Sequence, residues 1–300
     1  MNKKFRKVKK YLSVLEEQRY FDERPLENVT ICPCGYKTGH TPPPLSEFSP
    51  YTMGTVWGEN QPDRHAWFHF SFDGTEDMKA DPLQLQLESC GDHVFNRPQF
   101  MLYVNSELRQ GMDANHTYAV FDQRGHYDVY LYAYTGRMAT IGSSRVASKT
   151  AIPAVFSVGL RACLRRVHTD IEQLWYDIKV PLDTLEFLNS NSREYAQTLE
   201  HLYRAVSMLD LFEVGSEAFW KSVQQAQCYM TEAFYGNYCH AQPMTVLCVG
   251  HTHIDCAWLW TLQQTREKVQ RSFSTVVELM KRYPEYKFTS SQPLLYRKLK

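Results

Sequence analysis

The sequence predicts a multidomain chain of the β plus α/β type: an antiparallel β-sandwich of jelly-roll-like character, a helical connector, and the opening of an α/β domain. Three observations support this fold class. Short alternating runs of β-branched and aromatic residues, separated by turn residues, fill the stretch from about residue 66 to 164. From about residue 170 to 240, apolar residues recur every three to four positions, as in amphipathic helices. The last sixty residues read as strand, helix, strand.

The composition excludes several classes of protein. The chain has 300 residues, 43% of them hydrophobic, and its 33 basic side chains balance 33 acidic ones, so no net charge draws it toward nucleic acid or a membrane surface. No run of 18 apolar residues occurs. Eight irregularly spaced cysteines, without a predicted signal peptide, are expected to be reduced thiols. We therefore expect a cytoplasmic protein that binds neither nucleic acid nor membrane.

Residues 1–28 are predicted to hold an N-terminal amphipathic helix. Phe5, Val8, Leu12 and Leu15 recur at steps of three and four, which places them in one stripe of a helix. We expect this stripe to dock on the rest of the chain while the lysines remain solvated.

Residues 29–175 are predicted to form the β-sandwich domain. Its alternating runs are AWFHFSF, LQLQLES, FMLYVN, TYAVF, YDVYLYAYT and AVFSVGLRACL, and Gly, Asp and Pro separate them. Six or more strands without an intervening helical pattern indicate an antiparallel sandwich or jelly roll. Residues 29 to about 60 read as loops and short extended pieces.

Residues 176–242 are predicted to be a helical connector. Pro181 should lie near a helix boundary, and the Asn-Ser-Asn-Ser run at 189–192 should break the helix and cap the next one. A further helix is expected from Ser216 to about Phe234.

Residues 243–300 are predicted to be the first βαβ unit of an α/β domain. The run TVLCVG (245–250) is typical of a buried parallel strand, a long helix is expected from Leu262 to Arg282, and YKFTSS (286–291) is the second strand. The catalytic side of such a domain is the carboxyl end of its strands.

A polar cluster, GHTHIDCAWLW, follows the first of these strands. In an extended segment His251, His253 and Asp255 face the same side, and their nitrogen and oxygen donors suit Zn²⁺. The alternative is that they are loop residues that hydrogen-bond one another. Amidohydrolases also begin with His-x-His, whereas metallo-β-lactamase-like hydrolases continue with a second His where Cys256 stands here.

The cluster and the segment after it resemble the start of the catalytic domain of glycoside hydrolase family 38, the α-mannosidases, and most closely their cytosolic and vacuolar-type branch. The resemblance runs through GHTHIDCAWLW, then Arg271-Ser272-Phe273, Tyr283-Pro284-Glu285 and Ser291-Gln292. Upstream, LYVNSELRQGMDANH and YDVYLYAYTGR resemble the N-terminal β-sandwich of the same branch.

The resemblance implies a zinc-dependent, retaining exo-α-mannosidase that removes terminal mannose from oligosaccharides. It implies that His253 and Asp255 are zinc ligands, that His251 lies near the metal outside the first shell, and that Trp258 lines the sugar subsite. It further implies a (β/α) barrel of which this chain holds the first βαβ unit, and a homo-oligomer. The nucleophile, the acid/base and the remaining zinc ligand would lie beyond residue 300, so we expect the chain by itself to be inactive.

Some positions depart from the family pattern. Thr261 stands where a Pro is frequent, Gln264 stands where a Glu is usual, and Pro293 replaces a small residue. The Glu-to-Gln change removes a charge near the site mouth, so the role of position 264 is open.

Two other functions fit the sequence. The sandwich could be a carbohydrate-binding or assembly module, in which Trp57, Trp67 and Tyr103 stack on sugars. Alternatively, the metal motif could belong to a hydrolase of the amidohydrolase type, with its other ligands downstream.

Overall fold

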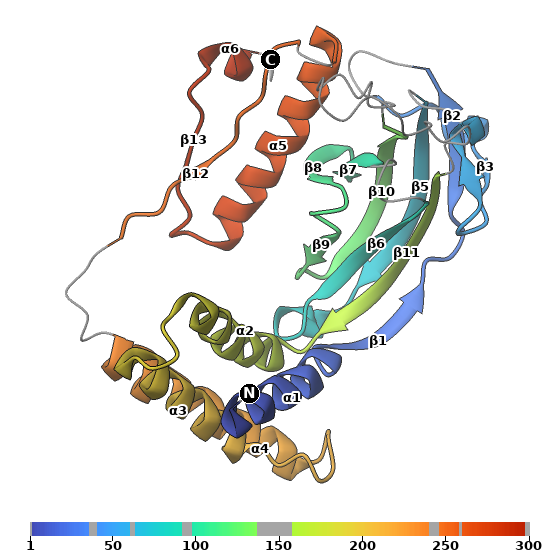
Figure 1. Ribbon diagram of the computed structural model, residues 1–300. Coiled ribbons are helices and arrows are strands. Elements are labelled where there is room, and N and C mark those ends of the chain that lie inside the picture. The colour runs from blue at the N-terminus through green and yellow to red at the C-terminus, as the bar shows by residue number, and fades with distance from the viewer. Residues whose placement is uncertain are drawn as a thin grey trace, which may run out of the picture. The chain divides into compact units, whose positions relative to one another are not determined.

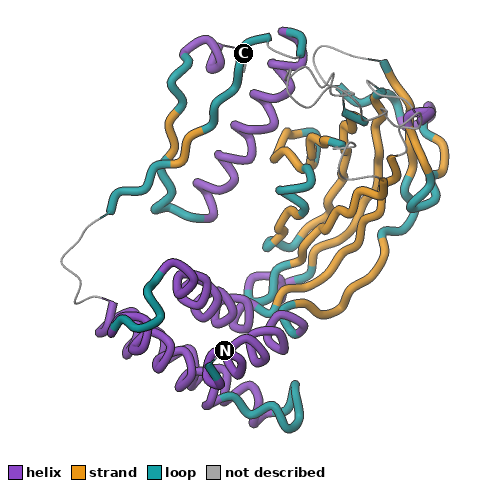
Figure 2. The backbone as a smooth tube through the Cα atoms, in the orientation of Figure 1, coloured by secondary structure: helices purple, strands orange, loops and turns teal. Residues whose placement is uncertain are grey.

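The computed structural model describes residues 2–35, 41–60, 64–91, 98–136, 158–239, 246–257 and 260–297. The chain divides into two compact units. The first comprises Met1–Glu23, Lys79–Pro82 and Arg165–Val246, and the second comprises Arg24–Met78, Leu83–Leu164 and Leu247–Lys300. The first is largely helical and the second contains most of the strands (Figures 1 and 2).

The first unit is a helix bundle with its own hydrophobic core. Its helices are α1 (Lys3–Glu17), α2 (Thr169–Thr184), α3 (Arg193–Met208), α4 (Glu217–Tyr229) and a π-helix (Met230–Cys239). The predicted stripe of α1 is confirmed, because Val8, Leu12 and Leu15 are buried in this core and Phe5 packs against its edge. Among the described residues no helix is both long and apolar enough to cross a membrane.

Pro181 lies in the last turn of α2, near the end of the helix as the sequence predicted. Proline has no N–H to bond the carbonyl of Asp177 one turn earlier. The hydroxyl of Tyr235 donates to that carbonyl oxygen at 3.0 Å instead, so the freed acceptor has a partner from the π-helix. The cap predicted in the 189–192 run is confirmed, because Ser192 accepts a hydrogen bond from the third residue of α3. Ser216, predicted as the start of the next helix, caps α4 in the same way.

Two antiparallel sheets, most of whose residues belong to the second unit, share one hydrophobic core. The strands of these sheets are β1 (Tyr20–Pro25), β2 (Thr30–Cys34), β3 (Ser49–Pro50), β4 (Val56–Trp57), β5 (His65–Gly74), β6 (Leu83–Gly91), β7 (Gln99–Val104), β8 (Glu107–Met112), β9 (Tyr118–Phe121), β10 (Gly125–Tyr134) and β11 (Val158–Val167). One sheet has the order β1-β11-β6-β9, with β4 also paired to β11, and the other has the order β3-β2-β5-β10-β7-β8. Short 3₁₀ turns lie at Leu45–Glu47, Gly58–Asn60, Glu76–Lys79 and Leu185–Phe187.

The period-two pattern decides which side chains enter the shared core. Phe68, Phe70 and Phe72 of β5 lie in that core, whereas Trp67, the residue before Phe68, lies on the opposite face. The six predicted strands are confirmed in their described parts, and residues 137–157 lie outside the described ones. The strand β8 was missed, because its sequence ELRQGM carries polar side chains and a Gly where an alternating pattern needs apolar residues.

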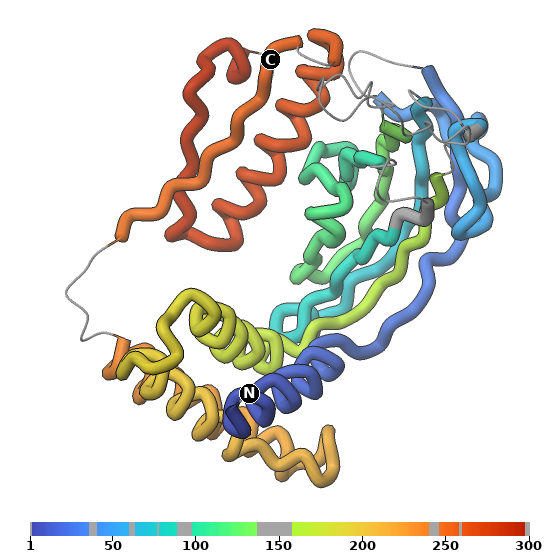
Figure 3. Tube along the Cα trace, viewed as in Figure 1, coloured from blue at the N-terminus to red at the C-terminus, as the bar shows by residue number. Residues whose placement is uncertain are grey.

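The C-terminal part of the second unit is a βαβ unit. It consists of β12 (Gly250–His251), α5 (Leu262–Arg282) and β13 (Phe288–Thr289), followed by α6 (Pro293–Arg297). The two strands pair in parallel, with Gly250 opposite Phe288, as the sequence predicted. In Figure 3 the orange and red segments that contain these two strands run next to each other, on the same side of α5.

The expectation of a buried strand at 245–250 is wrong for its described part. Val246 and Leu247 are 70% and 89% exposed, and pairing begins only at Gly250. The physical reason is that β12 has a single neighbouring strand, so no layer covers the apolar side chains before it.

Helix α5 packs against β8, and Gly111 is the point of closest approach. A Cβ added at Gly111 would lie 2.8 Å from Cβ of Arg271 and 3.0 Å from its carbonyl oxygen. The Gly111 N–H donates to the hydroxyl of Thr275 at 3.0 Å, which fixes the register of helix against strand.

Replacing Gly111 with Ala is therefore expected to lower the free energy of unfolding by about 1–3 kcal/mol, because backbone atoms of α5 must move to admit the methyl group. Urea unfolding of the variant measures this effect. Gly125 is the matched control for added bulk, since a Cβ there meets no atom within 4 Å, although its positive φ adds its own strain. Equal stability of Gly111→Ala and the parent chain would contradict the packing.

Candidate functional site

The predicted metal-binding segment leaves β12 at its carboxyl end and continues as a loop to α5. In this loop the Nε2 atom of His253 lies 2.8 Å from Oδ1 of Asp255. The two side chains are 66% and 41% exposed, so both donors are open to a ligand. The structure thus brings together the two residues that the sequence singled out as metal ligands.

The loop after Asp255 is held against the first turn of α5. The indole N–H of Trp260 contacts both the backbone carbonyl of Asp255, at 3.2 Å, and the hydroxyl of Thr265, at 3.1 Å. The N–H of Ala257 donates to the same hydroxyl. Ala257 has a φ of 56°, a left-handed conformation that costs free energy for a residue with a Cβ. Buried Thr265 therefore fixes the path of the segment that carries Asp255.

His251 lies in β12 and its side chain is exposed. It lines a cavity of about 380 Å³ together with Thr252 and His253. No group of three or more His, Cys, Asp or Glu side chains with metal-binding geometry occurs among the described residues. The described donor set at the loop is therefore the pair His253 and Asp255, with His251 on the same cavity wall. Trp258, the predicted sugar-subsite residue, lies outside the described residues.

The opposite wall of this cavity comes from the connection between β8 and β9. Asp113 accepts hydrogen bonds at its Oδ1 from the backbone N–H groups of Asn115 and His116, at 2.8 and 3.0 Å, and contacts the His116 ring at 3.1 Å. Burial acts to raise the pKa of Asp113, but the hydrogen bonds outweigh it and lower the pKa to about 2. The Asp113 carboxylate and burial act in opposite senses on His116, and the carboxylate prevails and raises the pKa of its ring.

Sequence reasoning did not assign Asp113 and His116 to the site. The signal was present in the Gly-x-Asp-x-Asn-His run at 111–116, which was used only as a mark of resemblance. The sequence pattern did not reveal strand β8, and the contact of β8 with α5 is what brings this turn close to the helix.

The first turns of α5 connect the site to the outer face of the six-stranded sheet. Gln264 accepts from the Thr261 N–H in a capping box and donates to the hydroxyl of Tyr134 at 2.9 Å. This gives a structural role to the Gln at position 264. One turn on, Glu267 is buried and accepts a hydrogen bond from the hydroxyl of Tyr132 at 3.3 Å. Burial raises the pKa of the Glu267 carboxyl to about 7.

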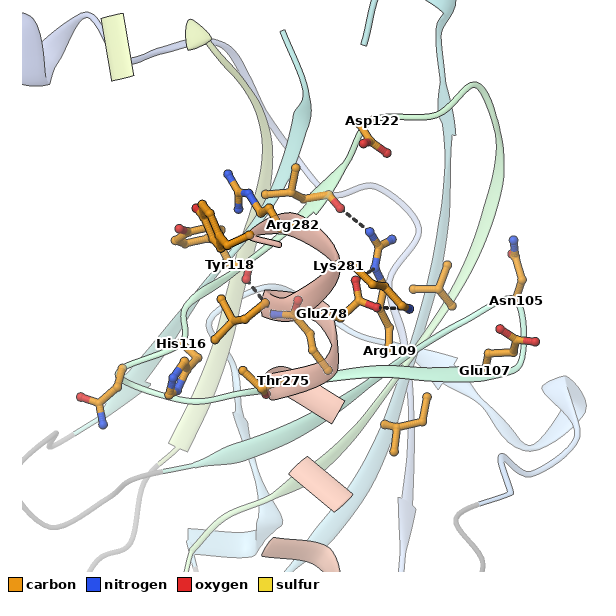
Figure 4. A pocket seen from close by; sticks show the side chains of 17 residues that line it. Asn105, Glu107, Arg109, His116, Tyr118, Asp122, Thr275, Glu278, Lys281 and Arg282 are labelled. Atoms are coloured by element: carbon orange, nitrogen blue, oxygen red, sulfur yellow. Dashed lines mark hydrogen bonds and ion pairs between the residues drawn. The ribbon is translucent and has the colours of Figure 1, made fainter. Parts of the chain in front are cut away.

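A larger cleft of about 650 Å³ lies further along α5 (Figure 4). Three of its charged side chains are paired with one another. Glu278 contacts Arg109 at 3.4 Å and Lys281 at 2.6 Å, and Arg109 also donates to the carbonyl of Val120. Arg282 lies over the ring of Tyr118 at 6.0 Å. These contacts brace β8 and β9 against the C-terminal half of α5.

The aromatic residues considered for a carbohydrate-binding module are not surface residues. Trp57 belongs to the shared core, and Trp67 and Tyr103 belong to the cluster on the outer face of the six-stranded sheet; all three are buried. Their rings therefore serve packing, and stacking on a sugar through them has no structural support.

Residues 243–299, which include β12, α5 and β13, match the family described as the glycosyl hydrolases family 38 N-terminal domain. The resemblance to family 38 that the His-x-His-x-Asp segment indicated is thereby confirmed, and this chain is a relative of the family 38 α-mannosidases.

Three relatives extend this finding. Alpha-mannosidase 2C1 of Homo sapiens is 27% identical over 256 residues, which are 82% of this chain and 23% of that protein. Alpha-mannosidase G of Dictyostelium discoideum is 39% identical over 241 residues, 77% of this chain and 21% of that protein. An alpha-mannosidase of Saccharomyces cerevisiae is 54% identical over 44 residues, 15% of this chain and 4% of that protein. The chain thus spans less than a quarter of the length of these relatives.

Proposed function

We propose that this chain is the N-terminal part of a zinc-dependent, retaining exo-α-mannosidase that removes terminal α-linked mannose from oligosaccharides. One observation carries the proposal. A segment that matches the family 38 domain leaves a parallel strand at its carboxyl end and presents His253 and Asp255 side by side, 2.8 Å apart. The names of the relatives supply the class of substrate.

The two donors fit a zinc ion by their chemistry. An imidazole nitrogen and a carboxylate oxygen are ligands that Zn²⁺ takes at about 2.0–2.2 Å, and both are exposed enough for an ion to reach them. In the proposed site His253 and Asp255 hold the ion, His251 lies close to it, and the remaining ligands come from a later part of the protein. The ion would supply coordination of sugar hydroxyls. Thr265 and Trp260 keep Asp255 in place through the contacts described above.

The chemical step is proposed to need two carboxylates. In retaining glycosidases one carboxylate attacks the anomeric carbon and the other acts first as acid and then as base, with the two about 5–5.5 Å apart. We place both in a later part of the protein, so the chain by itself should not turn over substrate. Trp258 is proposed to lie against the mannose ring, since an indole face suits the apolar face of a sugar.

The remaining parts of the proposal concern organisation. We interpret the two antiparallel sheets of the second unit as a jelly-roll-like sandwich and β12, α5 and β13 as the start of a (β/α) barrel. In sequence terms the domains are proposed to be 1–28, 29–175, 176–242 and 243–300. The full protein is proposed to be a cytoplasmic homo-oligomer.

The test is an assay of the full-length protein on an aryl α-mannoside, with and without a zinc chelator. We expect release of the aryl group, loss of release after chelation, and its return when zinc is added back. Retention is checked by following the anomer formed first by NMR. Release that a chelator leaves unchanged, or absence of release by the zinc-loaded protein, would contradict the proposal.

A further inference from the structure

The 380 Å³ cavity beside the metal-binding segment has two cations in its wall, Lys268 and Arg271, whose charges no described residue neutralises at close range. Both lie on α5, three residues apart, and therefore on the same face of the helix. Neither side chain forms a hydrogen bond or an ion pair within 4.0 Å with any residue that the structure describes. The Nζ atom of Lys268 lies 4.4 Å from the centre of the Trp260 ring, a cation–π contact that itself provides no oxygen acceptor.

In the neighbouring cleft, by contrast, cations with a structural role are paired with a carboxylate of α5. There Lys281 contacts Glu278 at 2.6 Å, and Arg109 shares the same carboxylate at 3.4 Å. Lys268 and Arg271 are partly buried, yet neither has a carboxylate at salt-bridge distance in the part of the chain that the structure describes. Holding partly buried cations without a counter-ion costs free energy, and this cost is offset when an anion is bound.

The acidic groups near the cavity do not remove the excess of positive charge. The carboxylate of Asp113 is in the wall, but it already accepts bonds from two backbone N–H groups and from His116, whose protonated form it favours. Glu267, also a residue of α5, is buried, and burial raises its pKa to about 7 although the nearby Arg271 acts to lower it. Burial and the nearby Arg271 lower the pKa of Lys268, which fits two like charges in one wall.

The remaining wall groups complete a site for an oxygen-rich anion. Ser272 and Thr252 offer hydroxyl groups, and Gln99 offers an amide. A guanidinium provides paired, planar donors for phosphate oxygens, and an ammonium provides a compact charge. We propose that this cavity binds an oxyanion, namely a phosphate group, through Lys268 and Arg271. The phosphate is either free or carried by a sugar, and the experiment below separates the two sources.

The test is isothermal titration of the 300-residue chain at low ionic strength, in the presence of a chelator so that no metal takes part. The probes are inorganic phosphate, mannose 6-phosphate and mannose. We expect saturable binding of inorganic phosphate that weakens as salt is added. Tighter binding of mannose 6-phosphate would identify a sugar phosphate as the ligand, and equal binding would identify free phosphate. Mannose itself should not compete.

The variants K268Q and R271Q are each expected to weaken phosphate binding at least tenfold, because each removes a charge-assisted hydrogen bond. K268R should retain binding, and K281Q is the control, since Lys281 is already paired with Glu278. Circular dichroism shows whether the R271Q variant is folded. If that variant is not folded, phosphate binding by the K268Q variant tests the proposal. Absence of phosphate binding, binding that K268Q leaves unchanged, or binding of mannose as strong as that of its phosphate would overturn the proposal.

Discussion

Replacing Asp255 with Ala in the full-length protein is expected to remove the bound zinc and to lower α-mannosidase activity at least 100-fold. The physical reason is that the variant deletes one of the two proposed metal donors of this segment and leaves only His253 on the loop. Groups that merely orient a metal ligand already change affinity or activity by about 10–100-fold, so a ligand itself should matter more. Metal analysis by mass spectrometry and the aryl α-mannoside assay measure the two effects.

A matched control for Asp255→Ala is available elsewhere in the same unit. Asp73 and His126 form an exposed His–Asp pair with the same 2.8 Å separation, on strands β5 and β10 and outside the cavity. Asp73→Ala should leave zinc content and activity unchanged. Full zinc occupancy in Asp255→Ala, or an equal loss in both variants, would show that the His253–Asp255 pair is not the metal site.

The second large effect concerns pH. The buried Glu267 has its pKa raised to about 7, whereas an unfolded chain releases that proton near pH 4.5. Below pH 4.5 the Glu267 carboxyl is protonated in both the folded and the unfolded state, so no free energy of unfolding is lost. Between pH 4.5 and 7 the folded state retains a proton that the unfolded state has released, so stability falls as pH rises, by about 3 kcal/mol in all.

The variant Glu267→Gln is therefore expected to be more stable than the parent chain at pH 8 by up to about 3 kcal/mol and to lack this part of the pH dependence. Urea unfolding at a series of pH values measures both curves. Glu285→Gln, an exposed position in the turn after α5, should shift stability by less than about 0.5 kcal/mol. A variant that is destabilised at pH 8 would mean that the carboxylate is charged and usefully paired in the folded protein.

Much of the fold could be predicted from local pattern. Strand β6 alternates strictly because Leu83, Leu85 and Leu87 enter the shared core. Helix α5 spans the predicted residues, and it begins at Leu262 because Thr261 caps it. The exposed apolar run before Gly250 could not be predicted, because hydrophobicity alone does not show whether a second strand or layer covers it. Strand β8 was missed for the converse reason: its polar residues pair and contact α5.

The candidate site likewise has a part that the sequence predicts and a part that depends on contacts between distant segments. His253 and Asp255 are two residues apart, so their proximity followed from an extended backbone. Asp113 and His116 are about 140 residues away in sequence, and only the packing of β8 against α5 brings them to the same cavity. The buried state of Glu267 likewise depends on Tyr132, a residue of another strand, and no local pattern reports it.

The proposed function requires that the segment after β12 holds a metal ion between His253 and Asp255. Anomalous X-ray diffraction from crystals of the full-length protein, collected on both sides of the zinc absorption edge, tests it most directly. We predict one strong zinc peak per chain within about 2.0–2.2 Å of a His253 ring nitrogen and an Asp255 carboxylate oxygen. A zinc-loaded, active protein whose peak lies elsewhere, with these two side chains uncoordinated, would contradict it.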